Sequence, residues 1–219
     1  MTFAINMKTA LLSVSIVMGM FAQSKPSHAA EVATLTVAGG CFWCVEADFE
    51  KVKGVKDVIS GFTGGTVPDA TYKQVTGGGT GHYEAVQIKY DPSVVSAGQL
   101  YGMFFRSIDP TDAGGQFCDR GPSYRTAIFA GADELDAAKQ AKAAAQSELG
   151  QKLVTPILTE GAFFPANAYH QDYYKQTKLV ITRFGPLSKA KAYKKYRASC
   201  GRDARVKELW GSAAPFAGS

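Results

Sequence analysis

A segment typical of a β-strand turns sharply into one typical of a helix, with a cysteine at the junction. Residues 32–37 are rich in β-branched residues, which favour a strand. Residues 42–52 carry apolar side chains at helical spacing. Gly39 and Gly40 permit the sharp turn because glycine adopts backbone conformations that other residues avoid. The pattern predicts a strand followed directly by a helix, with Cys41 at the first helical turn.

A thiol at such a junction is a candidate nucleophile. Unpaired backbone N–H groups and the positive end of the helix dipole stabilise an anion there. The thiolate is the reactive form of cysteine. We therefore expect the helix start to favour ionisation of Cys41.

The other predicted elements alternate between strands and helices. Alternating or β-branched stretches predict four more strands, at 54–62, 83–90, 125–129 and 153–158. Helical spacing predicts helices at 96–107 and from a cap at Asp133 to Gly150. Loops are expected at 68–81 and 109–121. Because the third strand follows a loop and not a crossover helix, we expect an α+β or α/β sandwich with a mixed sheet.

Glu84 occupies an unusual position in the predicted strand 83–90. It shares one face with Val86, Ile88 and Tyr90, and that face is the apolar one. A carboxyl group buried there would have a raised pKa and could serve as a proton donor. The alternative is that water reaches Glu84 at the strand end and that it has no role.

Further candidates lie in the predicted loops. Tyr72 and Tyr124 could donate hydrogen bonds to a developing oxyanion, although loop tyrosines are commonly packing residues. Asp119 lies close to Tyr124 along the chain. His170, within an aromatic stretch, is a possible base for Cys41, but we favour a structural role. The glycines at 77–81 lack the Gly-Lys-Ser/Thr that completes a phosphate-binding loop.

The four cysteines are Cys41, Cys44, Cys118 and Cys200. Their spacing is not that of a small disulfide scaffold. A chain of 219 residues can also bury a hydrophobic core large enough to fold without disulfides. A single Cys-x-x-Cys also lacks the second close pair of a structural zinc site, so no metal is expected.

Residues 1–29 have the features of a secretory signal peptide. Lys8 precedes an apolar run at 10–22, and Ser27 and Ala29 fit the small-residue positions of a cleavage site. The run is short for a membrane span, although an uncleaved anchor is the alternative, and Met7 is an alternative start. We expect an exported protein, in the periplasm, without stable membrane association once the signal is removed.

The end of the chain is basic. From residue 178 onward, ten Lys and Arg residues face only Asp203 and Glu208. Such asymmetry can mark a nucleic-acid or membrane-binding tail, but a Lys-rich helix is more often a solvated face. Export argues against a nucleic-acid partner. We expect three parts: a signal peptide at 1–29, a catalytic domain at 30–176, and a flexible basic C-terminal extension at 177–219 that carries Cys200.

In this order along the chain, several short motifs resemble those of the A-type peptide methionine sulfoxide reductases. The motifs are GCFW at 40–43, SGFTGG at 60–65, TGHYE at 80–84, YDP at 90–92, DPT at 109–111, DRGPSYR at 119–125 and YHQDY at 169–173. The resemblance implies a ferredoxin-like α/β sandwich with long loops. It also implies reduction of the S epimer of methionine sulfoxide, free or in peptides and proteins, without a metal or organic cofactor.

The resemblance assigns roles to the candidate residues. Cys41 would attack the sulfoxide sulfur, and Glu84 would supply a proton to the oxygen, which Tyr72 and Tyr124 hold. Asp119 would orient the surroundings of Cys41 through hydrogen bonds. Substrate-binding walls for the methyl group would be formed by Phe42 and Trp43.

The resemblance also implies that a second thiol converts the oxidised Cys41 to a disulfide, which a thioredoxin-like donor reduces. The candidates, in order, are Cys200, Cys118 and Cys44. Cys44 and Cys118 depart from the commonest family pattern. An exported Cys-x-x-Cys thiol–disulfide oxidoreductase is the main alternative function, and a secreted zinc- or peptide-binding module is a non-enzymatic one.

Overall fold

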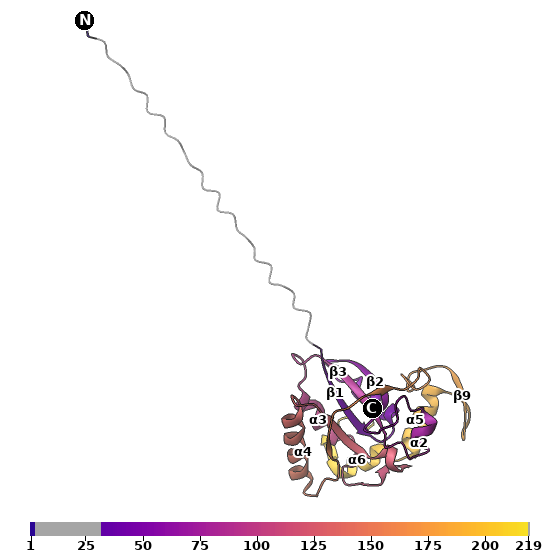
Figure 1. Ribbon diagram of the computed structural model, residues 1–219. Helices are drawn as coiled ribbons and strands as arrows, with labels where there is room; N and C mark the ends of the chain where they lie inside the picture. Colours follow the sequence, from indigo (N-terminus) through magenta and orange to yellow (C-terminus); the bar gives the residue numbers. More distant parts are fainter. Residues whose placement is uncertain (3–31, 219) are drawn as a thin grey trace.

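The computed structural model describes residues 1–2 and 32–218 (Figure 1). The predicted signal peptide therefore lies almost entirely outside the described residues. Within the part of the chain that is described, no helix is both long and apolar enough to cross a bilayer.

A six-stranded mixed sheet forms the centre of the molecule. Its strands follow the order β7-β6-β1-β3-β2-β8, and only β6 and β7 pair in parallel. Their bounds are β1 Ala33–Gly39, β2 Val55–Thr63, β3 Tyr83–Tyr90, β6 Thr126–Ala130, β7 Ile157–Thr159 and β8 Phe164–Pro165. The predicted α+β fold with a mixed sheet is confirmed. β7 is shorter than expected because Pro156, just before it, cannot donate a backbone hydrogen bond.

The helices of the central domain begin and end close to the predicted positions. They are α1 Phe42–Phe49, α3 Ala97–Phe105 and α4 Leu135–Leu149. Ser96 and Gln99 form a capping box at the start of α3. Gly150 ends α4 in the left-handed conformation, with φ of 65°. The predicted cap at Asp133 is wrong, because Glu134 is the first flanking residue of α4 and no side-chain cap is described there.

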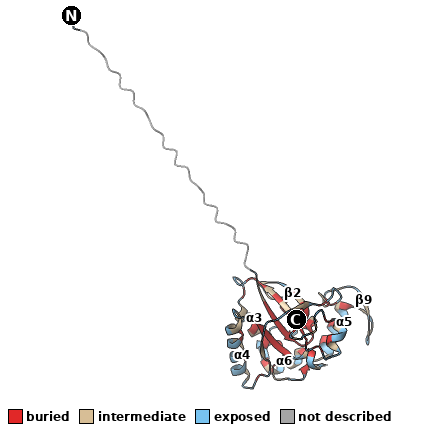
Figure 2. Cartoon of the chain, in the orientation of Figure 1, coloured by how far each residue is buried: buried red, intermediate tan, exposed pale blue. Residues whose placement is uncertain are grey.

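Both faces of the sheet are covered, and the larger core lies on the helical side. There Val37, Val86 and Ile88 pack against residues of α1, α3 and α4. The opposite face carries a smaller cluster that includes Tyr83, Ala85 and Phe129. Strand β3 contributes alternate residues to the two clusters, as its sequence pattern predicted. Figure 2 shows the buried strands between more exposed helices.

Short elements occupy the predicted loops and bring loop residues toward α1. They are α2 Tyr72–Thr76, β4 Gly115–Gln116, β5 Asp119–Arg120 and the 3₁₀ turn η1 Pro122–Tyr124. Helix α2 was not predicted. A five-residue helix contains too few positions to show a periodicity, although Thr71 and Gln74 form its capping box.

The C-terminal extension is folded against the domain. It forms the hairpin β9 Leu179–Thr182 and β10 Gly185–Ser188, the helices α5 Lys189–Ser199 and α6 Arg202–Trp210, and the short turn η2 Gly211–Ala213. Arg197 of α5 forms a buried ion pair with Asp48 of α1, with 2.8 Å between Nη1 and Oδ1. The expectation of a flexible tail is therefore wrong. Its arginines supply ion-pair partners, such as the partner of Asp48, that the domain alone lacks.

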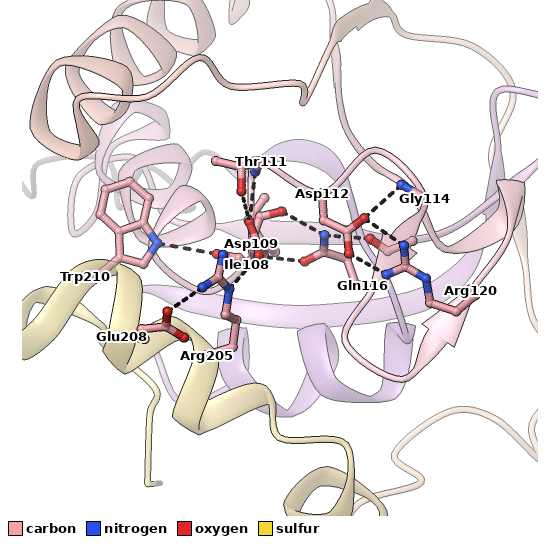
Figure 3. Close-up of polar contacts among 11 residues, drawn as sticks. Ile108, Asp109, Thr111, Asp112, Gly114, Gln116, Arg120, Arg205, Glu208 and Trp210 are labelled. Carbon is pink, nitrogen blue, oxygen red and sulfur yellow. Dashed lines mark hydrogen bonds and ion pairs between the residues drawn. The ribbon is translucent and has the colours of Figure 1, made fainter.

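Helix α6 also fastens the loop that follows α3 (Figure 3). Arg205 Nε lies 2.7 Å from Asp109 Oδ2, and Trp210 donates a hydrogen bond to the Ile108 carbonyl. Gln116, in the same loop, donates to the Asp109 carbonyl and accepts from the Asp109 N–H. This loop continues directly into Cys118 and Asp119, so α6 contributes to their placement.

Candidate active site

Cys41 lies where the sequence predicted, between β1 and the first residue of α1. Gly40 before it has a φ of +80°, and a Cβ added there would lie only 2.5 Å from Gln116 Cβ. Only glycine fits both the backbone conformation and the space. The turn therefore depends on close contact with the loop that carries Asp119. Cys41 is 7% exposed.

The Glu84 carboxyl group lies at the start of α1. It is 1% exposed, and its Oε2 accepts a hydrogen bond of 3.1 Å from the Phe42 N–H. Among the described residues, Oε1 has no hydrogen-bond partner. Burial, followed by the nearby charge of Asp119, raises the pKa of Glu84 well above its usual range. A neutral carboxyl group at neutral pH can donate a proton.

Tyr72 and Tyr124 converge on the same place from α2 and η1. Their phenols are hydrogen-bonded to each other. Burial and then the Glu84 charge raise the pKa of both phenols. Both therefore remain hydrogen-bond donors near neutral pH, beside Glu84 and Cys41.

The aromatic side chains around Cys41 differ in exposure. Phe42 is 1% exposed and belongs to the main core, whereas Trp43 is partly exposed. Trp43 stacks on Tyr173 with 3.9 Å between ring centroids. Trp43, Tyr173 and Tyr196 line part of an apolar cavity of about 180 Å³. Trp43 is thus available to a ligand, while Phe42 supports it from within.

His170 is part of the aromatic packing. It stacks on Tyr72 at 4.2 Å and on Trp43 at 5.7 Å between centroids. Burial, with a smaller contribution from the Lys189 charge, lowers the pKa of His170 to about 4. A neutral imidazole gives no ionic support to a Cys41 thiolate, in agreement with the structural role favoured from the sequence.

The helix start does not favour ionisation of Cys41, contrary to our expectation. Burial, the Cys44 side chain and the Glu84 charge raise the pKa of Cys41 well above that of an ordinary thiol. The Phe42 N–H at the start of α1 donates to Glu84 and not to sulfur, so it gives a Cys41 thiolate no hydrogen bond that would oppose these causes. The hydrogen bond from Cys41, and then the charges of Arg202 and Arg197, lower the pKa of Cys44.

The four cysteines form two pairs. Cys41 and Cys44 are buried, carry free thiols, and are hydrogen-bonded to each other. Cys118 and Cys200 form a disulfide with a Cα–Cα distance of 4.9 Å. Cys200, which the sequence ranked first as partner of Cys41, is therefore bonded to Cys118 in this structure. Cys44, ranked last, contacts Cys41 directly.

Asp119 lies beside Cys41 and Glu84, and its partner comes from the C-terminal extension. Its Oδ2 accepts a hydrogen bond from the phenol of Tyr196 in α5. Burial raises the pKa of Asp119, although the Tyr196 hydrogen bond opposes that shift. The charge of Asp119 in turn contributes to the raised pKa of Cys41 and of Glu84.

Sequence reasoning missed Tyr196, Arg197, Arg202 and Asp48 as neighbours of the thiols. Asp48 follows Cys44 by one helical turn, so a carboxylate on the apolar face of α1 was the signal that could have predicted a buried cation. The arginines gave no such signal, because a Lys- and Arg-rich helix has the composition of a solvated one.

Within the described part of the chain, only Glu46, Glu50 and Asp172 group closely enough to suggest a metal site. Their oxygens already have protein partners. Glu46 accepts hydrogen bonds from Ser60 Oγ and from the Asp172 N–H, and Lys175 pairs with Glu50 and Asp172. These contacts account for the cluster without an ion.

Comparisons with known proteins agree with this fold and site. A family model described as peptide methionine sulfoxide reductase matches residues 33–210, including most of the C-terminal extension. The chain is 45% identical over 191 residues to peptide methionine sulfoxide reductase MsrA 2 from Rhizobium meliloti, covering 86% of this chain and 89% of that protein. It is 41% identical over 207 residues to MsrA 2 from Caulobacter vibrioides, covering 94% and 100%.

Solved structures of the same type are similar. Mxr1 from Saccharomyces cerevisiae in reduced form matches with a TM-score of 0.62 and 34% identity, over 66% of this chain and 85% of that chain. Methionine sulfoxide reductase A of Corynebacterium diphtheriae matches with a TM-score of 0.61 and 29% identity, over 68% and 75%. The protein is thus an enzyme with a known reductase fold. The chain belongs to the peptide methionine sulfoxide reductase family, of the A type.

Proposed function

We propose that this enzyme reduces the S epimer of methionine sulfoxide, in peptides and proteins and as the free amino acid, with Cys41 as nucleophile. The observation that carries the proposal is the convergence of one thiol, one neutral carboxyl group and two paired phenols. A sulfoxide needs an electron pair at sulfur and protons at oxygen, and this group of residues can supply both.

The first step is attack of the Cys41 sulfur on the electrophilic sulfoxide sulfur. Cys44, which has the lower pKa and therefore ionises first, is the nearest base, and it takes the Cys41 proton as the Cys41 sulfur bonds to the substrate. Glu84 donates a proton to the substrate oxygen, which Tyr72 and Tyr124 hold. The net reaction moves the oxygen to Cys41 and a pair of electrons to the substrate, so that methionine leaves and Cys41 becomes a sulfenic acid.

The second step forms a disulfide. We assign the attack on the Cys41 sulfenic acid to Cys44, because it is the thiol in contact with Cys41. The sulfur–sulfur bond forms as water leaves. Cys200 and Cys118 are the other candidates, and they serve this step only if their own disulfide is first reduced.

A thioredoxin-like dithiol would then reduce the Cys41–Cys44 disulfide and become a disulfide itself. The signal-like features of residues 1–29 support export, so we propose that the enzyme and this donor act in the periplasm. Its substrates there would be exported proteins with oxidised methionines. Fractionation of cells that express the full chain tests this location, and activity confined to the cytoplasm would contradict it.

The function is tested with purified enzyme, dithiothreitol and the separate S and R epimers of a methionine sulfoxide peptide. We expect turnover of the S epimer only, and none with Cys41→Ser. Turnover of the R epimer alone would contradict the assigned epimer. Failure to reduce either would refute the proposal.

The hydrogen-bonded Cys41–Cys44 pair at a helix start also fits a thiol–disulfide oxidoreductase. That function predicts reduction of a protein disulfide and a strict need for both cysteines. The variant Cys44→Ser distinguishes the two functions, because a sulfoxide reductase should still yield one equivalent of methionine without Cys44. Loss of that single equivalent, with efficient reduction of insulin disulfides by the wild type, would favour the alternative.

A further inference from the structure

Two bonds join α5 of the C-terminal extension to residues 118–119, in the loop beside Cys41. The Tyr196 phenol of α5 donates a hydrogen bond to Asp119, and Cys200 at the end of α5 is bonded to Cys118. Cys118 and Asp119 are adjacent in sequence, and Cys200 follows Tyr196 by one helical turn. The disulfide and the hydrogen bond therefore hold the same two short segments together.

The Tyr196 side chain also contacts the substrate-facing part of the site. Its ring lies edge-on to Trp43 with 6.4 Å between centroids, and it lines the same apolar cavity. Burial, then the charges of Cys41 and Cys44, raise the pKa of its phenol. The hydroxyl group therefore remains a donor in the immediate neighbourhood of both thiols.

Asp119 has charged or titratable neighbours on every element around it. Besides Tyr196, these are Arg202 of α6, Cys41, Glu84 and Tyr124. Arg202 favours the ionised form of Asp119, but it is bound elsewhere, donating to the Gly39 and Ser107 carbonyls. Among the described residues, Tyr196 is the one whose side chain makes a hydrogen bond to the Asp119 carboxylate.

We propose that Tyr196 is a positioning residue of this active site: its phenol fixes the ionised Asp119 carboxylate beside Cys41, and the Cys118–Cys200 disulfide keeps that phenol within reach. The proposal rests on the proposed function, because Asp119 is taken to act on the thiol chemistry. It gives the second pair of cysteines a structural role in the site that is separate from resolving Cys41.

The direct test is the titration of Asp119, followed by carboxyl ¹³C NMR and assigned through the signal lost in Asp119→Asn. In Tyr196→Phe we expect the Asp119 midpoint to rise by about one pH unit, because a donor to the ionised form is removed. Tyr174→Phe is the matched control, since Tyr174 also donates to a carboxylate, but to Glu50 and not to Asp119. It should leave the midpoint unchanged.

The role of the disulfide is tested with the double variant Cys118→Ser/Cys200→Ser. We expect its Asp119 midpoint to rise as well. Adding Tyr196→Phe to this variant should raise the midpoint less than it does in the wild type, because the two bonds act together. A midpoint that does not respond to Tyr196→Phe would overturn the proposal. A normal midpoint in the double cysteine variant would overturn the part assigned to the disulfide.

The functional readout is single-turnover methionine formation as a function of pH, which does not require a resolving thiol. In Tyr196→Phe the acid limb should move to higher pH by the same amount as the NMR midpoint, so that at pH values well below both midpoints the rate is roughly tenfold lower. An unchanged profile despite a shifted midpoint would refute positioning. If the wild type forms no methionine, the proposed function fails, and the NMR midpoints decide the Tyr196–Asp119 relationship on their own.

Discussion

The Phe42 N–H donates a 3.1 Å hydrogen bond to Glu84 Oε2, across 42 residues of sequence. The donor at the start of α1 is thus used by a carboxyl group, and the thiol beside it remains protonated in the free enzyme. Glu84, and not Cys41, accepts the hydrogen bond that the first N–H group of α1 donates. This arrangement keeps the proton donor at a fixed position next to the sulfur.

The first prediction concerns Glu84→Gln. Glutamine keeps an oxygen that can accept from Phe42 but has no acidic proton, so single-turnover methionine formation should slow by about 10²–10⁴-fold. Substrate affinity should change little. Rapid quench with a limiting S-sulfoxide peptide measures the rate. A rate equal to that of the wild type would remove Glu84 from the mechanism.

The pH dependence of that rate is a second prediction. Burial raises the pKa of Glu84, so its proton is present at neutral pH and is lost as the pH rises through the raised pKa. The wild-type rate should fall on the alkaline side, and this limb should be absent from the residual activity of Glu84→Gln. An alkaline limb that survives the substitution would assign it to another group.

The third prediction separates the resolving thiols. After one turnover without reductant, mass mapping should find Cys41 bonded to Cys44, with Cys118–Cys200 unchanged. Cys44→Ser should yield one equivalent of methionine and then stop or slow sharply with a thioredoxin-type donor. A Cys41–Cys200 bond in the wild type would instead restore the order expected from the sequence.

The fourth prediction concerns Gly40. Gly40→Ala combines a positive φ with a Cβ 2.5 Å from Gln116 Cβ, so it should lower the free energy of unfolding by roughly 3 kcal/mol or more. Gly78→Ala is the control, since Gly78 has a φ of +85° but no described atom within 4 Å of the added Cβ. It should cost only about 1–2 kcal/mol. Urea unfolding measures both, and equal losses would show that the contact with Gln116 is unimportant.

The fifth prediction concerns stability and Glu46. Burial raises the pKa of Glu46 to about 8, above its unfolded value, so the folded state retains a proton that the unfolded state loses. The stabilisation that comes from the protonated Glu46 is complete below pH 4.5 and is lost as the pH rises through the folded-state pKa of about 8. Glu46→Gln should therefore gain stability relative to the wild type between pH 5 and 8, by roughly a few kcal/mol. A difference that is independent of pH would contradict the shift.

The sequence predicted those features that depend on local pattern. Alternation in residues 83–90 correctly placed Glu84 on the buried face of β3, and the glycine turn correctly placed Cys41 at the start of α1. The direction of the Cys41 pKa shift was wrong, because it depends first on burial and then on the neighbouring Cys44 and Glu84 side chains. Burial and the approach of Glu84 depend on other elements of the fold, and a linear pattern does not reveal them.

The prediction of a flexible C-terminal extension was the larger error. Its helices carry many Lys and Arg residues, so their composition suggested exposure, while Arg202 is only 2% exposed and Arg197 only 6%. The buried partner of Arg197 is Asp48, which lies in α1 149 residues away. The pairing of Cys118 with Cys200 depends in the same way on tertiary contacts between distant segments.

The Arg197–Asp48 ion pair has a consequence for the length of the protein. A chain that ended near residue 176 would retain Asp48 in the centre of α1 but would lose both arginines that balance it. It would also lose Val206, Trp210 and Phe216, which the extension contributes to the main core, so such a truncated chain should fold poorly even though every residue of the predicted catalytic domain is present. The residues after 176 are therefore part of the folding unit, although none of them lies in the predicted catalytic domain.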